Sequence, residues 1–168
     1  MATVTANYTA SATITLSTAS LASSATFVAG QESTVVTNTS NKFVDALLSG
    51  KVTVGTTPTI NTQILVYVFG ALNDTPTYPD VMDGTDSAET LTSVGVGRGF
   101  LKLAAVLDVD STTSDRVYNF GPVSVARLFG GTLPTHWSLF VTHNTGVILN
   151  ATGSNHAYSY VGVKYDVA

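Results

Sequence analysis

The stretch from His136 to Val167, "HWSLFVTHNTGVILNATGSNHAYSYVGVKYDV", decides the predicted fold. Turn residues at Asn144–Gly146 and Gly153–Asn155 divide it into three runs, "HWSLFVTHNTG", "GVILNATG" and "AYSYVGVKYDV", and each run predicts a β-strand. Short strands with regular turn signals are typical of antiparallel sandwiches and barrels. A double-sheet jelly roll of about eight strands fits a chain of 168 residues. We therefore predict an all-β protein, an antiparallel β-sandwich that is jelly-roll-like.

The clearest strand outside this stretch is "TQILVYVFG" (Thr62–Gly70), which has apolar side chains on both faces. Such a strand is expected at the centre of a sheet, covered on both sides, or in a subunit contact. One short helix is predicted near Ser124–Phe129, because Pro122 precedes it and Gly130 follows it. The segment "KFVDALL" is interpreted as a helical turn before a strand at "KVTVG", and "GVGRGF" as a bend or bulge. Further strands are predicted in "ATFVAG", "STVVTNT", "FLKLAAVLDVD" and "RVYNFG".

Two regions are predicted along the chain. Residues 1–24 form an extended Ala/Ser/Thr-rich arm or edge strands, and residues 25–168 form a single β-sandwich domain. Only 11 % of the residues are charged, against roughly 25 % in a typical soluble domain. A surface with few charges is less protected from association, so we expect a partner or an oligomer.

Composition excludes several classes of partner. The net charge is −4 and the seven basic residues are scattered from Lys42 to Lys164, which disfavours a nucleic-acid partner. The longest apolar run, Ile64–Leu72, is too short to cross a bilayer, and the N-terminal sequence lacks the features of a signal peptide. The chain contains no cysteine, which excludes disulfides, thiolate catalysis and cysteine-based metal sites.

The histidines give no sign of a metal or catalytic site. His136 and His143 are seven positions apart, so in a regular strand they face opposite ways and cannot share one metal ion. Alternation places Trp137 with Leu139 and Val141, which predicts that the tryptophan packs in the core. The "GxSxG" elbow of serine hydrolases is absent. We predict no enzymatic activity, no metal and no cofactor.

Two acidic turns leave calcium open as an alternative. "DVDSTTSD" (Asp108–Asp115) and "DVMDGTD" (Asp80–Asp86) each offer several carboxylates. The first lacks the central glycine and the terminal glutamate of an EF-hand loop, and the second is a signal of the same quality. Solvated loops are therefore the favoured interpretation of both turns.

The last strand and the acidic segment supply the candidate interface residues. If Val161, Val163 and Tyr165 face the core, the tyrosines on the opposite face project outward, where they suit a protein interface or a sugar platform. Cover by another part of the same chain is an equal alternative. Between Ala71 and Phe100 we expect a long, exposed acidic loop that carries interactions; its acids are Asp74, Asp80, Asp83, Asp86 and Glu89. The predicted interface residues are Tyr158, Tyr160, Lys164, Tyr78, Asp80 and Asp83.

A family resemblance is carried by "LPTHWSLFV", "NTG" and "YVGVKYDV" in the last third of the chain. This region resembles the end of small virion structural proteins of tailed bacteriophages, and is most similar to capsid decoration (cement) proteins with a jelly-roll fold. The resemblance implies a homo-oligomer, usually a trimer, made in the host cytoplasm and bound to the major capsid protein on the outer surface of the head. It carries no catalytic residues.

Three functional hypotheses follow from the sequence. The first is a decoration protein that stabilises contacts between capsid subunits, with the uncharged N-terminal region as an arm for strand addition. The second is a carbohydrate- or receptor-binding module of a fibre or tail tip, in which Tyr158, Tyr160, Trp137 or Tyr78 stacks on sugar. The third is an icosahedral coat protein, which is weakened because no Lys or Arg precedes Lys42.

Overall fold

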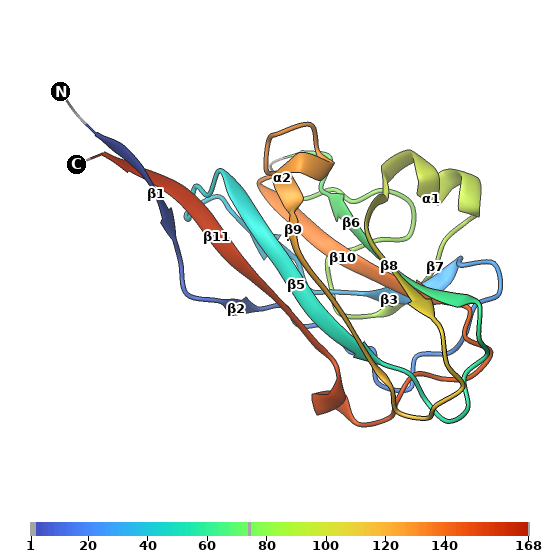
Figure 1. Ribbon diagram of the computed structural model, residues 1–168. Helices are drawn as coiled ribbons and strands as arrows, with labels where there is room; N and C mark the ends of the chain where they lie inside the picture. The colour runs from blue at the N-terminus through green and yellow to red at the C-terminus, as the bar shows by residue number, and fades with distance from the viewer. Residues whose placement is uncertain (1–2, 74, 168) are drawn as a thin grey trace.

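The computed structural model describes residues 3–73 and 75–167, apart from the side chain of Val167. Two antiparallel sheets pack face to face (Figure 1). The strands are β1 (Val4–Tyr8), β2 (Ala12–Thr13), β3 (Ala29–Glu32), β4 (Val36–Thr37), β5 (Asp45–Thr53), β6 (Thr62–Gly70), β7 (Ala88–Thr90), β8 (Lys102–Val109), β9 (Val117–Ser124), β10 (His136–His143) and β11 (Ala157–Val167). The helices are α1 (Val94–Phe100), α2 (Val125–Leu128) and the 3-10 helix η1 (Gly153–Asn155).

The strand order is that of a jelly roll. One sheet has the order β1-β11-β5-β9, with β2 also paired to β11, and the other has the order β7-β3-β10-β6-β8, with β4 also paired to β10. If β1 and β2 count as one strand, β3 and β4 as one, and β7 is set aside, eight strands remain. In chain order, the first, eighth, third and sixth form one sheet, and the second, seventh, fourth and fifth form the other. This is the arrangement of two interlocked Greek keys, so the predicted jelly-roll-like sandwich is confirmed.

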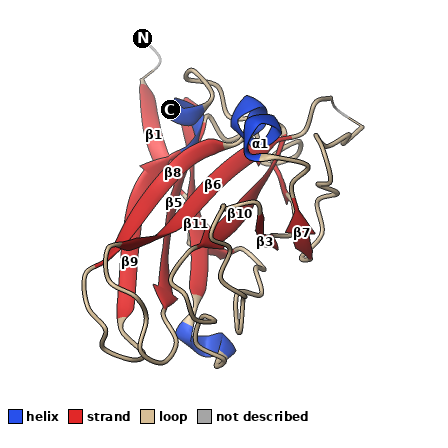
Figure 2. Cartoon of the chain, turned by 90° about the vertical axis from the view of Figure 1, so that its right-hand side faces the viewer, coloured by secondary structure: helices blue, strands red, loops and turns tan. Residues whose placement is uncertain are grey.

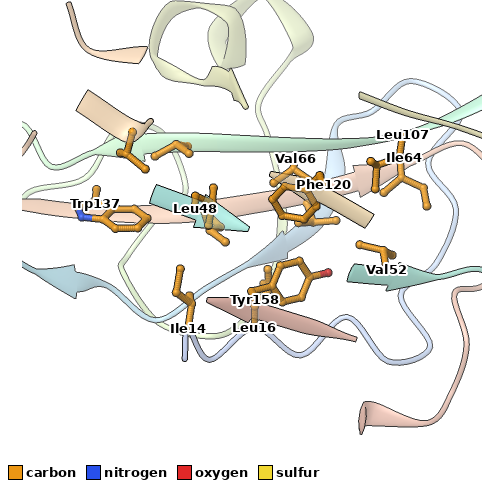
Figure 3. Close-up of a cluster of buried hydrophobic side chains, with 14 of the residues drawn as sticks. Ile14, Leu16, Leu48, Val52, Ile64, Val66, Leu107, Phe120, Trp137 and Tyr158 are labelled. Carbon is orange, nitrogen blue, oxygen red and sulfur yellow. The ribbon is translucent and has the colours of Figure 1, made fainter. Parts of the chain in front are cut away.

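Strand β10 is buried along its whole length. Its inner face contributes Trp137, Leu139 and Val141 to the core between the two sheets (Figure 3). Its outer face contributes Phe140 to a second, smaller core with Phe69. The prediction that Trp137 packs in the core is therefore confirmed.

The second core lies under residues 78–101, which we call the covering segment. Met82 and Leu91 are buried against the outer face of the second sheet, together with Phe69 and Phe140. The expectation of one long exposed loop was therefore wrong in part, because this part of the chain contains β7 and α1 and two apolar residues anchor it to the sheet, although most of its residues are exposed or half-buried. Its acidic side chains stay nearer to solvent, and Asp74 lies outside the described residues.

The orientation predicted for the last strand was also wrong. Tyr158 is only 2 % exposed, and its hydroxyl lies 2.9 Å from Oγ1 of Thr18. Tyr160 packs edge-on against Trp137, with 5.5 Å between ring centroids. Figure 3 shows Tyr158 and Trp137 in the same cluster of buried side chains. The outer face of β11 instead carries Val161, Val163 and Tyr165, because both faces of this strand are apolar and only packing selects the inner one.

Several local predictions can be compared with the structure. Strand β6 has the bounds expected, and α2 forms within the predicted short helix, capped by Ser124 Oγ accepting from the Arg127 amide at 3.2 Å. The "GVGRGF" segment is part of α1 rather than a bulge, since the Ser93 hydroxyl accepts from the Val96 amide and caps the helix. The "KFVDALL" segment leads straight into β5 without a helical turn, and "GVILNATG" contributes only an isolated bridge, Leu149 to Val54. No helix in the described residues is long and apolar enough to cross a membrane.

The inward orientation of Tyr158 has a measurable consequence. Tyr158→Phe leaves the buried Thr18 hydroxyl without its partner and should lower the free energy of unfolding by about 1–2 kcal/mol. Tyr165→Phe, at a position 62 % exposed on the same strand, is the matched control and should change it little. Urea denaturation of the two variants makes the comparison; equal stability of both would contradict the orientation described.

Candidate functional site

The two terminal strands form a ribbon that projects from the body of the sandwich. Strand β11 pairs with β5 only as far as Val163, opposite Asp45. Beyond that point it pairs with β1, from Tyr8 opposite Val163 to Val4 opposite Val167. Figure 1 shows this pair extending away from the sandwich at the upper left. We call β1 and residues 163–167 of β11 the terminal ribbon.

The terminal ribbon has one apolar face. Directly opposite residues of an antiparallel pair share a face, which places Val4, Ala6 and Tyr8 with Val163 and Tyr165. Val4 is 61 % exposed, and Tyr8 and Tyr165 are each 62 % exposed. Exposed aromatic and aliphatic side chains that adjoin on one face are typical of an interaction surface.

The opposite face of the terminal ribbon is polar. Asn7 Nδ2 donates to Asp166 Oδ2 at 2.6 Å, and Lys164 Nζ lies 3.5 Å from Asp166 Oδ1. The hydrogen bond from Asn7, with a further effect of Lys164, lowers the pKa of the Asp166 carboxyl. These contacts are exposed, so they fix the register of the two strands more than they stabilise the fold.

Strand β1 is also an edge of its sheet. It ends the strand order, and within the described residues its outer edge has no strand partner. Natural edge strands are usually protected by lysine, proline, bulges or covering loops. The sequence of β1, VTANY, carries neither proline nor charge. The terminal ribbon therefore offers both an apolar face and backbone groups for strand addition.

The predicted interface residues do not form one surface. Tyr158 and Tyr160 pack in the core, and Lys164 lies on the polar face of the terminal ribbon. Tyr78 belongs to the covering segment, where its ring packs edge-on against Phe69 at 6.2 Å between centroids. Asp80 and Asp83 stabilise turns of the same segment. Asp80 Oδ2 accepts from the Thr92 amide at 2.9 Å, and Asp83 Oδ1 accepts from the Thr85 amide at 2.9 Å.

The residues that sequence reasoning missed are Val4, Tyr8 and Tyr165. The signal was present in the alternation of "VTANY", whose Val4, Ala6 and Tyr8 share a face. Its meaning depends on pairing with residues about 160 positions away, which alternation alone does not reveal.

An acidic cluster lies between β3 and the covering segment; Glu32 is its buried member, while Asp83 is exposed and Glu89 is half-buried. Glu32 is fully buried and accepts from the amides of Asp83 at 3.1 Å and Gly84 at 2.7 Å. Burial, with smaller effects of the Asp83 and Glu89 charges, raises the pKa of Glu32 to about 7 despite those two hydrogen bonds. Glu32 thereby holds the turn at Asp83–Gly84 against β3.

This acidic cluster offers an incomplete set of metal ligands. One carboxylate oxygen from each of Glu32, Asp83 and Glu89 lies within 4.8 Å of the others. Calcium takes six to eight oxygen ligands. Three carboxylates that each contribute one oxygen supply about half of that number. Asp83 Oδ1 also accepts from both the amide and the hydroxyl of Thr85. The geometry thus assigns these side chains a structural role in the covering segment.

The other acidic turn does not bring its carboxylates together. Asp110 Oδ2 lies 3.1 Å from Arg116 Nη2. Asp115 Oδ1 accepts from Asn150 Nδ2 at 2.6 Å, and Asp108 Oδ1 accepts from Gln63 Nε2 at 2.9 Å. Each carboxylate is directed to a different neighbour, so this turn is not arranged as a calcium loop.

The histidines are buried rather than exposed at the surface. His143 is fully buried, with Nε2 3.1 Å from the Leu21 carbonyl and Nδ1 2.9 Å from the Thr145 hydroxyl. Burial lowers the pKa of His143, and likewise that of His156. A neutral His143 that donates to Leu21 ties the N-terminal region to the end of β10.

Comparisons of the chain with protein-family models, curated proteins and solved structures found no match. The functional assignment therefore depends on the chain's own geometry. That geometry singles out the terminal ribbon, whose apolar face brings together the exposed side chains of Val4, Tyr8 and Tyr165.

The raised pKa of Glu32 predicts a specific pH dependence. Native Glu32 retains its proton between pH 4.5 and about 7, where the unfolded chain has lost it, so its contribution to stability falls as pH rises. Relative to wild type, Glu32→Gln should gain up to about 3 kcal/mol in the free energy of unfolding across this window. His143 and His156 contribute to stability in the opposite direction, but their contributions are the same in both proteins and cancel in the difference between variant and wild type.

Denaturant titrations at a series of pH values measure this difference. Glu89→Gln is a second variant from the same cluster; it removes one of the charges that raise the pKa of Glu32, so it should weaken the pH dependence that Glu32 causes. A Glu32→Gln difference that stays constant across the window would contradict the assignment of a buried, largely protonated carboxyl.

Proposed function

We propose that the protein is a virion structural protein, a decoration (cement) protein that binds the outside of a bacteriophage head and stabilises contacts between capsid subunits. The observation that carries this proposal is the terminal ribbon, with an apolar face and an unprotected edge on a complete jelly roll. Jelly rolls are frequent in capsid and lectin domains, so the fold agrees with the proposal without establishing it.

The chemistry of the terminal ribbon suits attachment to a protein shell. Val4, Tyr8 and Tyr165 bring large apolar area to a contact, and Ala6 leaves space between the two larger side chains of β1. The first 31 residues carry no charge, so a partner covering β1 buries no ion of that strand. A partner that binds only the assembled shell stabilises it by mass action.

The proposed partners are the major capsid protein and further copies of this chain. The sequence resemblance implies a trimer, and the proposed location is the outer surface of the head after synthesis in the host cytoplasm. A trimer lets several ribbons contact neighbouring subunits at once, which raises the effective concentration of each contact.

A carbohydrate- or receptor-binding module is the second candidate, and the packing disfavours it. Trp137 and Tyr158 are buried, and Tyr160 packs against Trp137. Tyr78 is half-buried against Phe69. The four aromatic rings that the sequence analysis assigned to sugar stacking are thus used in the two cores.

Binding to heads tests the proposed attachment surface. Purified heads of the phage that encodes this chain should co-sediment with the wild-type protein. The double variant Tyr8→Asp/Tyr165→Asp should lose at least about tenfold in affinity, because it places charges in an apolar contact. The control is Ile148→Asp, at an exposed apolar position outside the terminal ribbon.

Circular dichroism verifies that each variant is folded. Wild-type protein that fails to bind the heads would overturn the proposed function. Full binding by the double variant would show that the terminal ribbon is not part of the contact with the head.

The oligomeric state provides an independent measurement. Size-exclusion chromatography with light scattering should report a trimer of the 17.4 kDa chain. A strict monomer at all concentrations tested would count against the decoration function as stated.

A further inference from the structure

A pocket of about 350 Å³ lies between α1 and the outer face of the second sheet. This volume falls within the usual range for small-molecule sites, roughly 300–1,000 Å³. Figures 1 and 2 both place α1 beside the ends of β6 and β8, and Figure 1 shows the terminal ribbon on the opposite side of the sandwich. The pocket is therefore separate from the attachment surface proposed above.

The floor of the pocket is apolar. Leu65 comes from β6 and Leu103 from β8, on the face opposite the residues that form the central core. Leu91 and Leu101 flank α1 and complete a leucine-lined surface. Such a surface favours an aliphatic body over a polar one, because contact removes apolar area from water.

The roof of the pocket is thin because α1 presents a glycine to it. Gly97 lines the pocket, and a Cβ at this position would lie 2.8 Å from Leu91 Cδ1. Because Gly97 has no side chain, α1 can approach Leu91 closely without filling the pocket between the helix and the sheet.

Two polar groups adjoin the leucine floor. Arg98, which is exposed on α1, and Tyr67, which is half-buried on β6, both line the pocket. In the described part of the chain the ion pairs are Arg116–Asp110 and Lys164–Asp166, so Arg98 has no carboxylate partner there. The Tyr67 hydroxyl likewise makes no hydrogen bond to a described residue. Burial raises the pKa of Tyr67, and the nearby positive charge of Arg98 acts in the opposite direction.

These groups fit a ligand with one negative charge. A guanidinium presents two parallel N–H donors that match a carboxylate, and a phenol adds a third donor. One cation balances a single charge, whereas a doubly charged phosphate would retain an unpaired charge beside an apolar floor.

We propose that this pocket binds an aliphatic monocarboxylate, with its chain on the leucine floor and its carboxylate on Arg98 and Tyr67. This site is independent of the proposed decoration function, because it uses no residue of the terminal ribbon. Its failure would leave that function untouched, and the reverse also holds.

Calorimetric titration of the full chain with octanoate and with octanol tests the charge requirement. Octanoate should bind about tenfold or more tightly than octanol, which lacks the charge. Arg98→Gln should remove this preference, whereas Arg127→Gln, which makes the same charge change on α2, should keep it. Thermal melting confirms that each variant is folded.

Methyl NMR locates the bound ligand. Octanoate should shift the signals of Leu65, Leu101 and Leu103, and Leu103→Ser should weaken the binding of both ligands. The proposal is overturned if wild type binds no octanoate, binds octanol equally well, or keeps its preference in Arg98→Gln. Methyl shifts that appear with heads but not with octanoate would assign the pocket to a protein partner and also overturn it.

Discussion

The burial of β10 on both faces is the constraint on which the rest of the structure depends. Trp137, Leu139 and Val141 join the core between the sheets, and Phe140 joins the second core on the outer face. A strand with apolar side chains on both faces needs cover on both sides. One cover is the opposing sheet, and the other is the covering segment.

The covering segment also forms the acidic cluster and the pocket on that side of the molecule. Met82 and Leu91 bind the covering segment to the sheet. Its descent onto the sheet brings Asp83 and Gly84 to the buried Glu32, and it places α1 over Leu65 and Leu103. The acidic cluster and the pocket are thus both products of covering one apolar sheet face.

Strand β11 has two roles along its length. Near its start, Tyr158 and Tyr160 fill the inter-sheet core, and the strand lies between β2 and β5. From Val163 onward it leaves β5 and continues with β1 alone. In this projecting part, the outer face of β11 adjoins the apolar side chains of β1, and together they form an exposed apolar surface. We therefore propose the terminal ribbon as the attachment surface.

Sequence periodicity was sufficient for the elements whose pattern is unambiguous. The two-faced apolar run of β6 and the Pro/Gly-flanked helix α2 were predicted, and regular turn signals led to the correct sandwich. The orientation of β11 was not predictable, because valines and tyrosines are both apolar and only non-local packing distinguishes the faces. In β5, cross-strand pairing outweighed the helical pattern of "KFVDALL".

The candidate site was less predictable than the fold. The covering segment was misjudged because Met82 and Leu91 are isolated apolar residues among acidic ones. The uncharged N-terminal region was expected to act as an arm for strand addition, but its pairing with residues at the far end of the chain was not predicted. Local alternation shows which side chains of a strand share a face, but it does not show which distant strand pairs with it.

Hydrogen exchange on the free and head-bound protein tests the central claim most directly. The backbone amides of β1 and of residues 163–167 should exchange rapidly in the free protein and become protected on heads. Amides of β10 should exchange slowly in both states. Protection confined to the covering segment, or no change anywhere, would contradict the assignment of the terminal ribbon as the attachment surface.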